Sequence, residues 1–308
     1  MDATFNVTYI TVGGHVEMGK YRYLYFVFMF LVYVLILVSN CTIVCVIWIH
    51  RNLHEPMYIF IAALSVNSVL FSTAVYPKFL KDILSEKQII SYSACLFQYF
   101  LYYSLGCSDF LLLSCMAYDR YVSICKPLQY QTIMGKITVC FMLFFSWFLP
   151  AFQVGLSVGL RKNNKLCSFT LKGILCNNLV NMLECVSSVG LFVSGLFTWI
   201  SMAILPAAFI LFTYTKIFIV THRSHGAVRR KAAETCLPHL LVLLCFSCLC
   251  AFDIMLPRVS NDFSNTLQYI MSVQVLLYSP LFNPIIYGLK MKEISKHLKR
   301  WFCFGVFF

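Results

Sequence analysis

The stretch YLYFVFMFLVYVLILVSNCTIVCVIWIH, residues 23–50, contains no Asp, Glu, Lys or Arg. A helix of about 20 mostly apolar residues crosses the ~30 Å hydrocarbon layer of a membrane, so this run is long enough to span it. The run is too long for the apolar core of a signal peptide, and it has no cleavage site of small residues. We therefore expect it to remain in the mature protein as a transmembrane helix.

The same pattern occurs six more times along the chain. The further uncharged runs are Pro56–Pro77, Gln88–Ser108, Ile137–Leu160, Cys185–Thr215, Thr235–Phe252 and Phe263–Leu289. Only helices and closed barrels satisfy their backbone in lipid, and these runs lack the period-2 alternation of barrel strands. We predict an all-α membrane protein, a bundle of seven transmembrane helices in one domain over residues 1–308. The expected helices are 23–50, 56–81, 92–125, 137–160, 188–221, 229–256 and 264–289.

The composition agrees with a lipid environment. Of the 308 residues, 60% are hydrophobic and 12% are charged, whereas a soluble domain carries about 25% charged residues. The net charge of +12 does not indicate nucleic-acid binding, because the basic side chains are scattered between apolar runs and form no continuous stripe. The expected surroundings are a lipid bilayer, and no nucleic acid is expected as a partner.

The distribution of basic residues predicts the orientation. Of the 24 Lys and Arg residues, 14 fall on one side, at residues 51, 120–136, 216–231 and 290–300, and 10 fall on the other. The richer side is expected to be cytoplasmic, which places the N-terminus outside. Asn6-Val7-Thr8 is then a glycosylation acceptor on the external side. Asn40-Cys41-Thr42 has the same form but lies inside the first helix.

Four of the 15 cysteines differ from the rest, which mostly lie in the membrane runs and are expected to pack there. They are Cys95, Cys167, Cys176 and Cys185, all at or near external helix ends, in an oxidising compartment. Four cysteines allow three pairings, and their spacing does not choose among them. A zinc site is the competing interpretation, but the segment has no nearby His and no Cys-x-x-Cys pair. No metal or other cofactor is expected.

The most specific motif is MAYDRYVSICKPL, residues 116–128, at the cytoplasmic end of the third helix. Its arginine, Arg120, can be held by the neighbouring Asp119 while the bundle is closed and released to a partner when the bundle opens. An isolated Asp-Arg pair would instead suggest an arginine that extends to the interface. The whole 13-residue string resembles the helix-three ending of odorant receptors, within the rhodopsin-like G-protein-coupled receptors.

Further segments resemble this family in the right order over essentially the whole chain. They are LHEPMY at 53–58, Lys231-Ala232, Thr235-Cys236 and His239-Leu240 at the start of helix six, and PLFNPIIY at 280–287. Residues 76–80 and 236–239 look most like the fish branch of the family. The resemblance implies a receptor, not an enzyme, that binds a small odorant and activates the olfactory stimulatory G protein, raising cyclic AMP. It also implies the plasma membrane, in cilia of olfactory sensory neurons.

The resemblance implies roles for particular residues. The implied G-protein switch consists of Asp119, Arg120, Tyr121, Tyr214, His239, Asn283, Pro284 and Tyr287. The implied disulfides are Cys95–Cys176 and Cys167–Cys185. Pro284 removes a backbone donor and so weakens the helix, unless it is an ordinary membrane proline; Asn283 is expected to satisfy freed backbone groups.

After helix seven, residues 291–302 alternate basic and apolar side chains, which predicts a short amphipathic helix on the inner leaflet. Cys303 is a candidate for palmitoylation.

Asp109 is an acid in the middle of helix three. Such a residue is functional by default, because burying a charge in the membrane is costly. We expect it to couple the ligand site to the cytoplasmic side through an ion or protons shared with Ser279 and Asn283. The alternative is a neutral, hydrogen-bonded Asp. Many related receptors have a helix-two Asp where this chain has Ser68, beside Asn67, which is expected to weaken cation binding.

The expected ligand site lies in the external half of the bundle. Its residues by resemblance are Tyr102, Tyr103, Gly106, Cys107, Thr198, Met202, Ser247, Cys250 and Ile254. Small and aromatic side chains also pack helices together, which is the alternative for each of them. The set is apolar with a few hydroxyls and thiols, so a small neutral or weakly polar ligand fits. Asp253, near the outer end of helix six, is the one acid close to this set; it could hold a cationic group of a ligand, or it could simply be a solvated helix end. At Phe246-Ser247 the chain departs from the Phe-Tyr pair that the family often has.

Other membrane functions fit less well. A transporter needs discontinuous helices, usually in inverted repeats, with ionisable groups at the midplane; this chain has one such acid and no repeat. An intramembrane enzyme would show a motif such as Gly-x-Ser-x-Gly or His-Glu-x-x-His, and neither is present. A biogenic-amine receptor carries a counter-ion where this chain has Tyr102. A rhodopsin-like receptor for another small ligand stays as the alternative.

Overall fold

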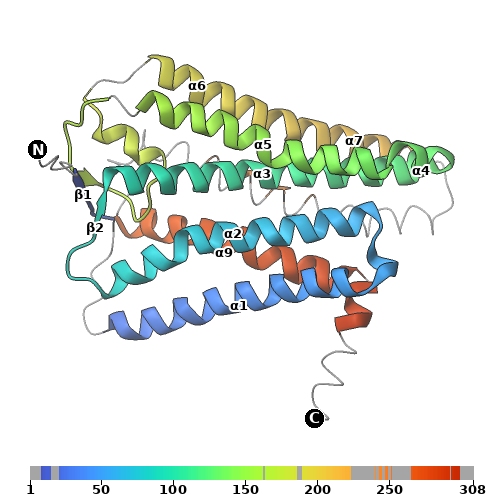
Figure 1. Cartoon of the computed structure of the whole chain (residues 1–308), viewed down its shortest axis with the longest axis horizontal. Coiled ribbons are helices and arrows are strands. Elements are labelled where there is room, and N and C mark those ends of the chain that lie inside the picture. The colour runs from blue at the N-terminus through green and yellow to red at the C-terminus, as the bar shows by residue number, and fades with distance from the viewer. Residues whose placement is uncertain are drawn as a thin grey trace, which may run out of the picture.

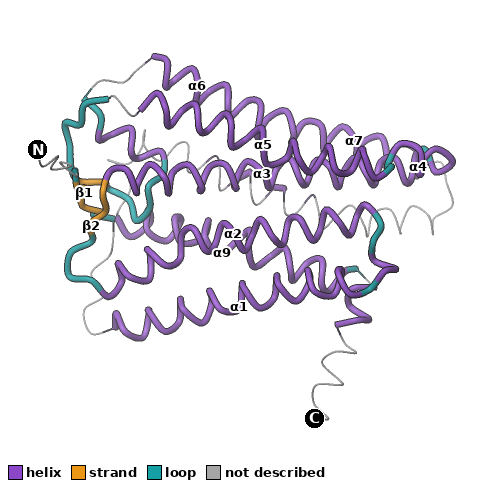
Figure 2. Tube along the Cα trace, viewed as in Figure 1, coloured by secondary structure: helices purple, strands orange, loops and turns teal. Residues whose placement is uncertain are grey.

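The computed structural model describes residues 8–14, 21–161, 164–185, 189–222, 240, 243–244, 247–248, 251, 265–291 and 293–298. Long helices lie side by side with their axes roughly parallel, and strands occur only at one end (Figures 1 and 2). The long helices are α1 (Arg22–Ile49), α2 (Pro56–Leu84), α3 (Tyr92–Cys125), α5 (Lys136–Arg161), α6 (Val189–Trp199) with its continuation α7 (Leu205–His222), and α9 (Asn265–Lys290).

Local chemistry explains where several helices begin. Pro56 is the first residue of α2, a position where the missing N–H costs nothing and the fixed φ favours the helix. Ser91 caps α3, because its Oγ accepts a hydrogen bond from the Ala94 amide at 3.3 Å. Among the described residues, five helices are long and apolar enough to cross a membrane, with α6 and α7 counted as one span over Val189–His222.

The predicted sixth helix, 229–256, lies mostly outside the described residues. Positions 240, 243–244, 247–248 and 251 within it are helical. Leu243 is buried in the same apolar cluster as Tyr214 of α7 and Tyr287 of α9. One side of the described part of this segment therefore packs into the bundle, while Leu244, Cys248 and Ala251 are exposed.

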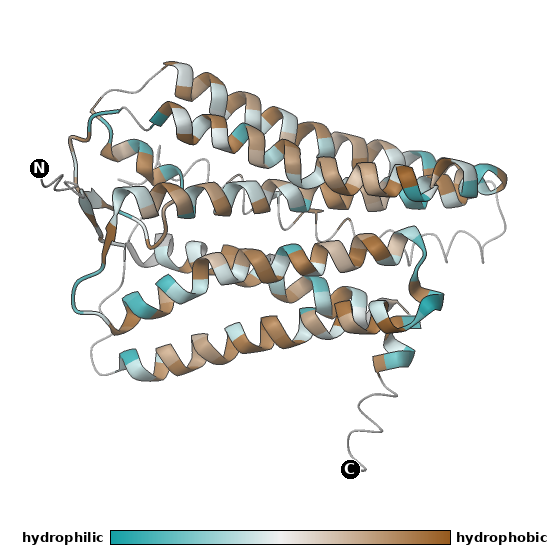
Figure 3. Ribbon diagram, in the orientation of Figure 1, coloured by the Kyte–Doolittle hydropathy of each residue, from teal (hydrophilic) through white to brown (hydrophobic). Residues whose placement is uncertain are grey.

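Two apolar clusters fill the bundle, one in each half of its length. The cytoplasmic cluster includes Phe60, Met116 and Tyr214, and the external cluster includes Tyr76 and Phe79. Many large apolar side chains instead face outward; they include Leu24, Leu31, Phe144, Phe148 and Phe152. The long helices are largely hydrophobic along their length (Figure 3), and these exposed side chains extend that character to the surface. An apolar surface of this extent indicates contact with lipid.

A small sheet, absent from the sequence prediction, covers the external end. The strand β1 (Tyr9–Val12) lies between β2 (Ile89–Ser91), to which it is antiparallel, and β3 (Thr170–Leu171), to which it is parallel. Ile10 and Val12 point inward and are buried against an apolar cluster that contains Cys95. The sheet therefore joins the start of the chain, the start of α3 and the long external loop.

The opposite end carries short helices. The 3-10 helices η2 (Arg51–Leu53) and η3 (Pro127–Gln129) and the helix α4 (Tyr130–Ile133) connect the long helices there, and α4 lies at the end of the bundle away from β1 and β2 (Figure 1). Residues 293–298 form a further helical turn, in which Ile294 is fully buried while Glu293 and Lys296 are exposed. This two-sided turn falls within the predicted amphipathic helix 291–302; Cys303 lies outside the described residues.

Candidate functional site

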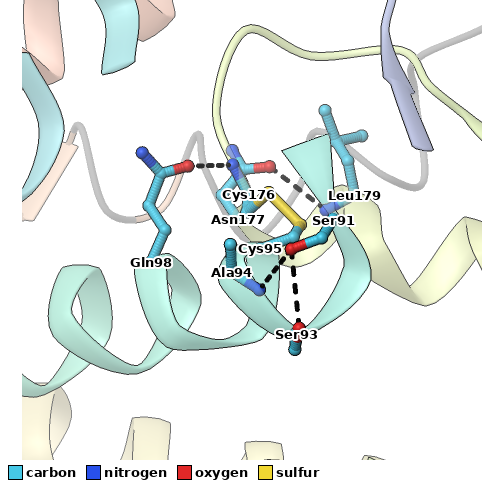
Figure 4. The surroundings of a disulfide bond; sticks show 8 residues. All are labelled: Ser91, Ser93, Ala94, Cys95, Gln98, Cys176, Asn177 and Leu179. Atoms are coloured by element: carbon cyan, nitrogen blue, oxygen red, sulfur yellow. Dashed lines mark hydrogen bonds between the residues drawn. A yellow bond between two sulfur atoms is a disulfide. The ribbon is translucent and has the colours of Figure 1, made fainter. Parts of the chain in front are cut away.

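The external loop is attached to α3 by a disulfide. Cys95, in the first turn of α3, is bonded to Cys176, with the two Cα atoms 5.4 Å apart. Gln98, one turn further along α3, accepts a hydrogen bond from the Cys176 amide at 3.2 Å, as Figure 4 shows. The second disulfide joins Cys167 and Cys185. Both pairs are those that the family resemblance implied.

The attached loop forms a roof over part of the bundle. The roof comprises residues 174–184 and includes the 3-10 helix η4 (Asn178–Leu183). Asn177 caps η4 by accepting a hydrogen bond from the Leu179 amide at 3.2 Å. Ile174 and Leu175 are buried in the external cluster beside Tyr102. The roof therefore reaches into the bundle.

The predicted ligand residues of α3 lie directly below this roof. The Tyr103 hydroxyl accepts a hydrogen bond from the Asn178 amide at 2.9 Å. The ring of Tyr102 is nearly perpendicular to that of Tyr103, with the two ring centroids 5.0 Å apart. The ring centroid of Tyr102 lies 5.5 Å from that of Phe71. A Cβ placed on Gly106 would meet no atom within 4 Å, so open space adjoins α3 there. Cys107, the next residue, is partly exposed.

The predicted residues of helix five lie around a widened turn. Residues Ile200–Ile204 form a π-helical turn just before Pro206, and such turns are frequent at functional sites. Met202 within this turn is buried at 1% exposure, and Thr198 is partly exposed. Ser201 donates a hydrogen bond to Gln153 Oε1 at 3.1 Å, a contact with α5 that the sequence analysis missed.

On helix six, Ser247 is partly buried. The following predicted residues lie outside the described part of the chain: the ligand residues Cys250 and Ile254, the nearby Asp253, the switch residue His239 and the glycosylation acceptor Asn6.

Asp109 belongs to a buried polar network. Its Oδ1 accepts a hydrogen bond from Asn67 Nδ2 at 2.8 Å, and the same nitrogen also donates to the Leu105 carbonyl at 2.9 Å. Trp147 Nε1 donates to Asn67 Oδ1 at 3.0 Å. This network joins α2, α3 and α5 at one point. Neither Asn67 nor Trp147 was predicted to belong to it, although an amide side chain in an uncharged run was a usable signal.

A hydrogen bond between Asn283 of α9 and Ser68 of α2 joins these two helices beside Asn67. Asn283 is buried and donates from Nδ2 to Ser68 Oγ at 3.3 Å, and Ser68 donates to the Leu64 carbonyl at 3.0 Å. The side chain of Ser279, the other expected partner of Asp109, lies outside the described atoms. Ser68, which takes the place of an acid in helix two, therefore contacts the helix-seven motif directly.

Asn40, and not Asn283, serves the backbone group that Pro284 leaves free. In an α-helix the amide of residue 284 would bond the carbonyl of residue 280, and a proline has no amide hydrogen. Asn40 Nδ2 donates to that carbonyl, on Pro280, at 2.9 Å. Its complete burial also removes Asn40 from the surface where a glycan would be attached.

At the cytoplasmic end of α3 the predicted ion pair is formed. Asp119 is fully buried and accepts hydrogen bonds from Arg120 Nη2 at 2.8 Å and Nε at 3.1 Å. Tyr130 of α4 donates from its hydroxyl to the other carboxylate oxygen of Asp119 at 2.7 Å. Burial, and then the bond to Asp119, raise the pKa of Tyr130, so its hydroxyl stays protonated as a donor. Tyr130 was missed from the sequence because it lies beyond the motif.

The structure also describes the positions of other residues predicted to take part in the switch. Tyr214 of α7 and Tyr287 of α9 are buried in the cytoplasmic cluster. Tyr121 is partly buried, and its ring lies 6.4 Å from that of Tyr118. Pro284 is buried within α9.

The sequence profile of the family described as "Olfactory receptor" matches residues 29–304 of this chain. The chain belongs to the olfactory receptor family. Human olfactory receptor 2AG2 is 33% identical over 267 residues, which are 86% of this chain and 84% of the relative. Human olfactory receptor 11A1 is 33% identical over 271 residues, covering 87% and 85%. Human olfactory receptor 10J4 is 32% identical over 273 residues, covering 86% and 85%.

Family membership settles the broad function of this olfactory receptor. It is an odorant receptor with seven transmembrane helices, located in the plasma membrane, and it is not an enzyme. Its partners are a small ligand and a heterotrimeric G protein. The expected likeness to the fish branch stays a prediction, since the relatives named above are human.

Proposed function

We propose that this olfactory receptor binds a small neutral or weakly polar odorant below the loop roof and signals through the olfactory stimulatory G protein, raising cyclic AMP. The proposed pocket is lined by Tyr102, Tyr103, Gly106, Cys107, Thr198, Met202, Ser247, Cys250 and Ile254. The observation that carries the pocket is the open space at Gly106, which lies one turn along α3 from Tyr103, the residue that bonds to the roof. The proposed cell location is the cilium of the olfactory sensory neuron.

The chemistry of this region supports a weakly polar ligand. Tyr102 and Tyr103 supply aromatic surface, and Cys107 and Thr198 supply a thiol and a hydroxyl. Pockets of this kind bury most of a small ligand and orient it with a few polar groups. A ligand with one hydroxyl, carbonyl or ester group satisfies these conditions.

The switch that we propose is the pair of Asp119 and Arg120. In the structure both guanidinium contacts of Arg120 are directed to Asp119, which Tyr130 also binds. An arginine held in this way is not available to a partner. We propose that opening of the cytoplasmic half of the bundle releases Arg120 to the G protein, with Tyr121, Tyr214, His239, Asn283, Pro284 and Tyr287 taking part in the rearrangement.

We further propose that Asp109 couples the two ends of the bundle, by way of an ion or protons shared with Ser279 and Asn283. Its position supports this role. Asp109 lies between the pocket residues of α3 and the Asp-Arg motif on the same helix, and its bond to Asn67 links it to α2.

The test is a screen of small odorants in cells that lack endogenous stimulatory G proteins. The receptor is expressed with either the olfactory stimulatory α subunit or an inhibitory one, and cyclic AMP is measured. We expect at least one odorant to raise cyclic AMP only with the stimulatory subunit. A ligand-dependent fall with the inhibitory subunit alone would contradict the proposed partner.

The variant Arg120→Ala tests the switch once an agonist is known. We expect the agonist response to be lost at equal surface expression. Lys126→Ala is the matched control, because it removes an exposed positive charge just after the same helix without touching Asp119. An unchanged response in Arg120→Ala would overturn the assignment.

A further inference from the structure

An ion pair joins the end of α5 to the external loop. Arg161, the last residue of α5, donates from Nη1 to Glu184 Oε1 at 2.7 Å. The side chains are only 4% and 3% exposed. A pair this deeply buried keeps its geometry only when further hydrogen bonds satisfy both charges.

Both partners make further bonds, and among the described residues only the Nε of Arg161 is left without a hydrogen-bond partner within this pair. Arg161 Nη2 donates to Asn181 Oδ1 at 2.5 Å, and Asn164 Nδ2 donates to Glu184 Oε2 at 2.7 Å. Asn181 lies within η4, and Glu184 directly follows it. Charge-assisted bonds of this kind are strong and directional, so the guanidinium of Arg161 holds the far end of η4 in one orientation relative to α5.

The same guanidinium reaches the pocket through two aromatic rings. Its central carbon lies 5.0 Å from the ring centroid of Tyr99, and the ring of Tyr99 lies 4.6 Å from that of Tyr103. The Tyr103 hydroxyl in turn accepts the bond from Asn178, the first residue of η4. The roof helix is thus held at its first residue by Tyr103 and at its last turn by Arg161.

The disulfides do not duplicate this link. Cys95–Cys176 attaches the loop to α3 before η4 begins. Cys167–Cys185 joins the residue after Glu184 to another point of the same loop, and backbone hydrogen bonds from Cys167 and Ser168 to the Leu183 carbonyl lie beside it. These links stay within the loop, whereas the ion pair of Arg161 and Glu184 joins the end of η4 directly to α5.

We propose that Arg161 and Glu184 are positioning residues that hold the roof closed over Tyr103 and so limit the size and polarity of the odorant. This inference rests on the pocket assigned under the proposed function. With the pair intact, the roof excludes water and bulky groups above Tyr103. With the pair broken, an uncompensated charge remains in a buried place, and the end of η4 must move outward to hydrate it.

Access of a charged reagent to the pocket tests the proposal without any odorant or G protein. The reporter is a thiol introduced by Gly106→Cys, where the added side chain enters open space, together with Cys107→Ser to remove the adjacent thiol. Intact cells are treated from outside with a permanently charged methanethiosulfonate reagent. The modification rate at position 106 is measured by peptide mass spectrometry at equal surface expression.

We expect Arg161→Met and Glu184→Gln each to raise the modification rate by about tenfold or more, since the loss of one partner strands a buried charge. The charge swap Arg161→Glu with Glu184→Arg is expected to return the rate close to that of the reporter alone. Lys78→Met is the matched control, because it breaks a second external ion pair among the described residues, with Asp82 in α2. It is expected to leave the rate unchanged.

Equal rates in both single variants and the reporter receptor would overturn the proposal. Loss of both single variants from the cell surface, with surface recovery in the swap, would assign the pair to folding and would also overturn the positioning role. A failed odorant screen would leave these rates untouched, so failure of the proposed function is recognised separately.

Discussion

Asn40 Nδ2 on α1 lies 2.9 Å from the carbonyl oxygen of Pro280 on α9. The proline at position 284 leaves that carbonyl without its helical donor, so a side chain from another helix completes the backbone bonding of helix seven. This bond couples the helix-seven motif to α1. A movement of α9 around Pro284 that separates Pro280 from α1 would break this hydrogen bond.

The variant Asn40→Leu is expected to destabilise the receptor by about 1–3 kcal/mol, the cost of leaving a buried carbonyl unsatisfied. Thermal unfolding of the purified receptor in detergent measures the change. Thr42→Val is the control, because Thr42 donates to the Val38 carbonyl on an exposed part of the same helix. Equal effects of the two substitutions would contradict a special role for Asn40.

The variant Tyr130→Phe is expected to raise basal cyclic AMP. It removes one hydrogen bond to the charged carboxylate of Asp119, worth about 1.5–3 kcal/mol, and so weakens the group that restrains Arg120. The equilibrium between closed and open bundles is then expected to shift by about 10- to 150-fold. Gln129→Ala changes the exposed neighbour and is expected to have no effect. Basal signalling that stays at the wild-type level in Tyr130→Phe would argue against the restraint.

Removal of the two disulfides is expected to have unequal effects. Cys95–Cys176 spans a sequence separation of 81 residues and Cys167–Cys185 spans 18. By loop-closure entropy the longer link stabilises by about 1 kcal/mol more. Cys95→Ser should therefore reduce surface expression more than Cys167→Ser, and Cys140→Ser, at an exposed free cysteine, should not reduce it. Antibody staining of unpermeabilised cells measures this, and the reverse order would refute it.

The variant Asp109→Asn is expected to change both basal activity and its dependence on sodium, because it removes the charge that an ion or proton would meet in the network. Replacement of sodium by a large organic cation, with cyclic AMP as the readout, measures this. Trp147→Phe is the control, since it removes a bond to Asn67 and keeps the carboxylate. If Asp109→Asn alters neither property, the residue is only structural.

The open space at Gly106 predicts a size effect on ligand choice. Gly106→Leu is expected to fill the space and to weaken the response to an agonist by about tenfold or more, while Gly106→Ala, one methyl group larger than glycine, has a smaller effect. Dose-response curves at equal surface expression measure the shift. Tyr103→Phe, which keeps the ring and frees the Asn178 amide, separates contact with the ligand from support of the roof. Unchanged potency in both Gly106 variants would place the pocket elsewhere.

The chain's local patterns determined the fold class, because a membrane-spanning segment must satisfy its own backbone and carry an apolar surface, and both are properties of a continuous run of residues. The uncharged run around Phe60 and the one around Phe144 each fall in a long helix for this reason. The motif at Asp119 and Arg120 was readable because its two members are adjacent. The short strand β1 was not, because its partners in the sheet lie 78 to 82 residues away in β2 and 159 residues away in β3.

The partnerships were decided by the tertiary structure alone. Asn40 meets Pro280, Asn67 meets Asp109 and Arg161 meets Glu184 because the bundle brings different helices and loops together. In the sequence each of these polar residues is one among many, and its partner lies 240, 42 or 23 positions away. A buried polar group needs a hydrogen-bond partner. The sequence by itself determined which segments cross the membrane and which polar residues they carry. Only packing in three dimensions decided which of these polar residues are joined, because their partners come from other helices and loops.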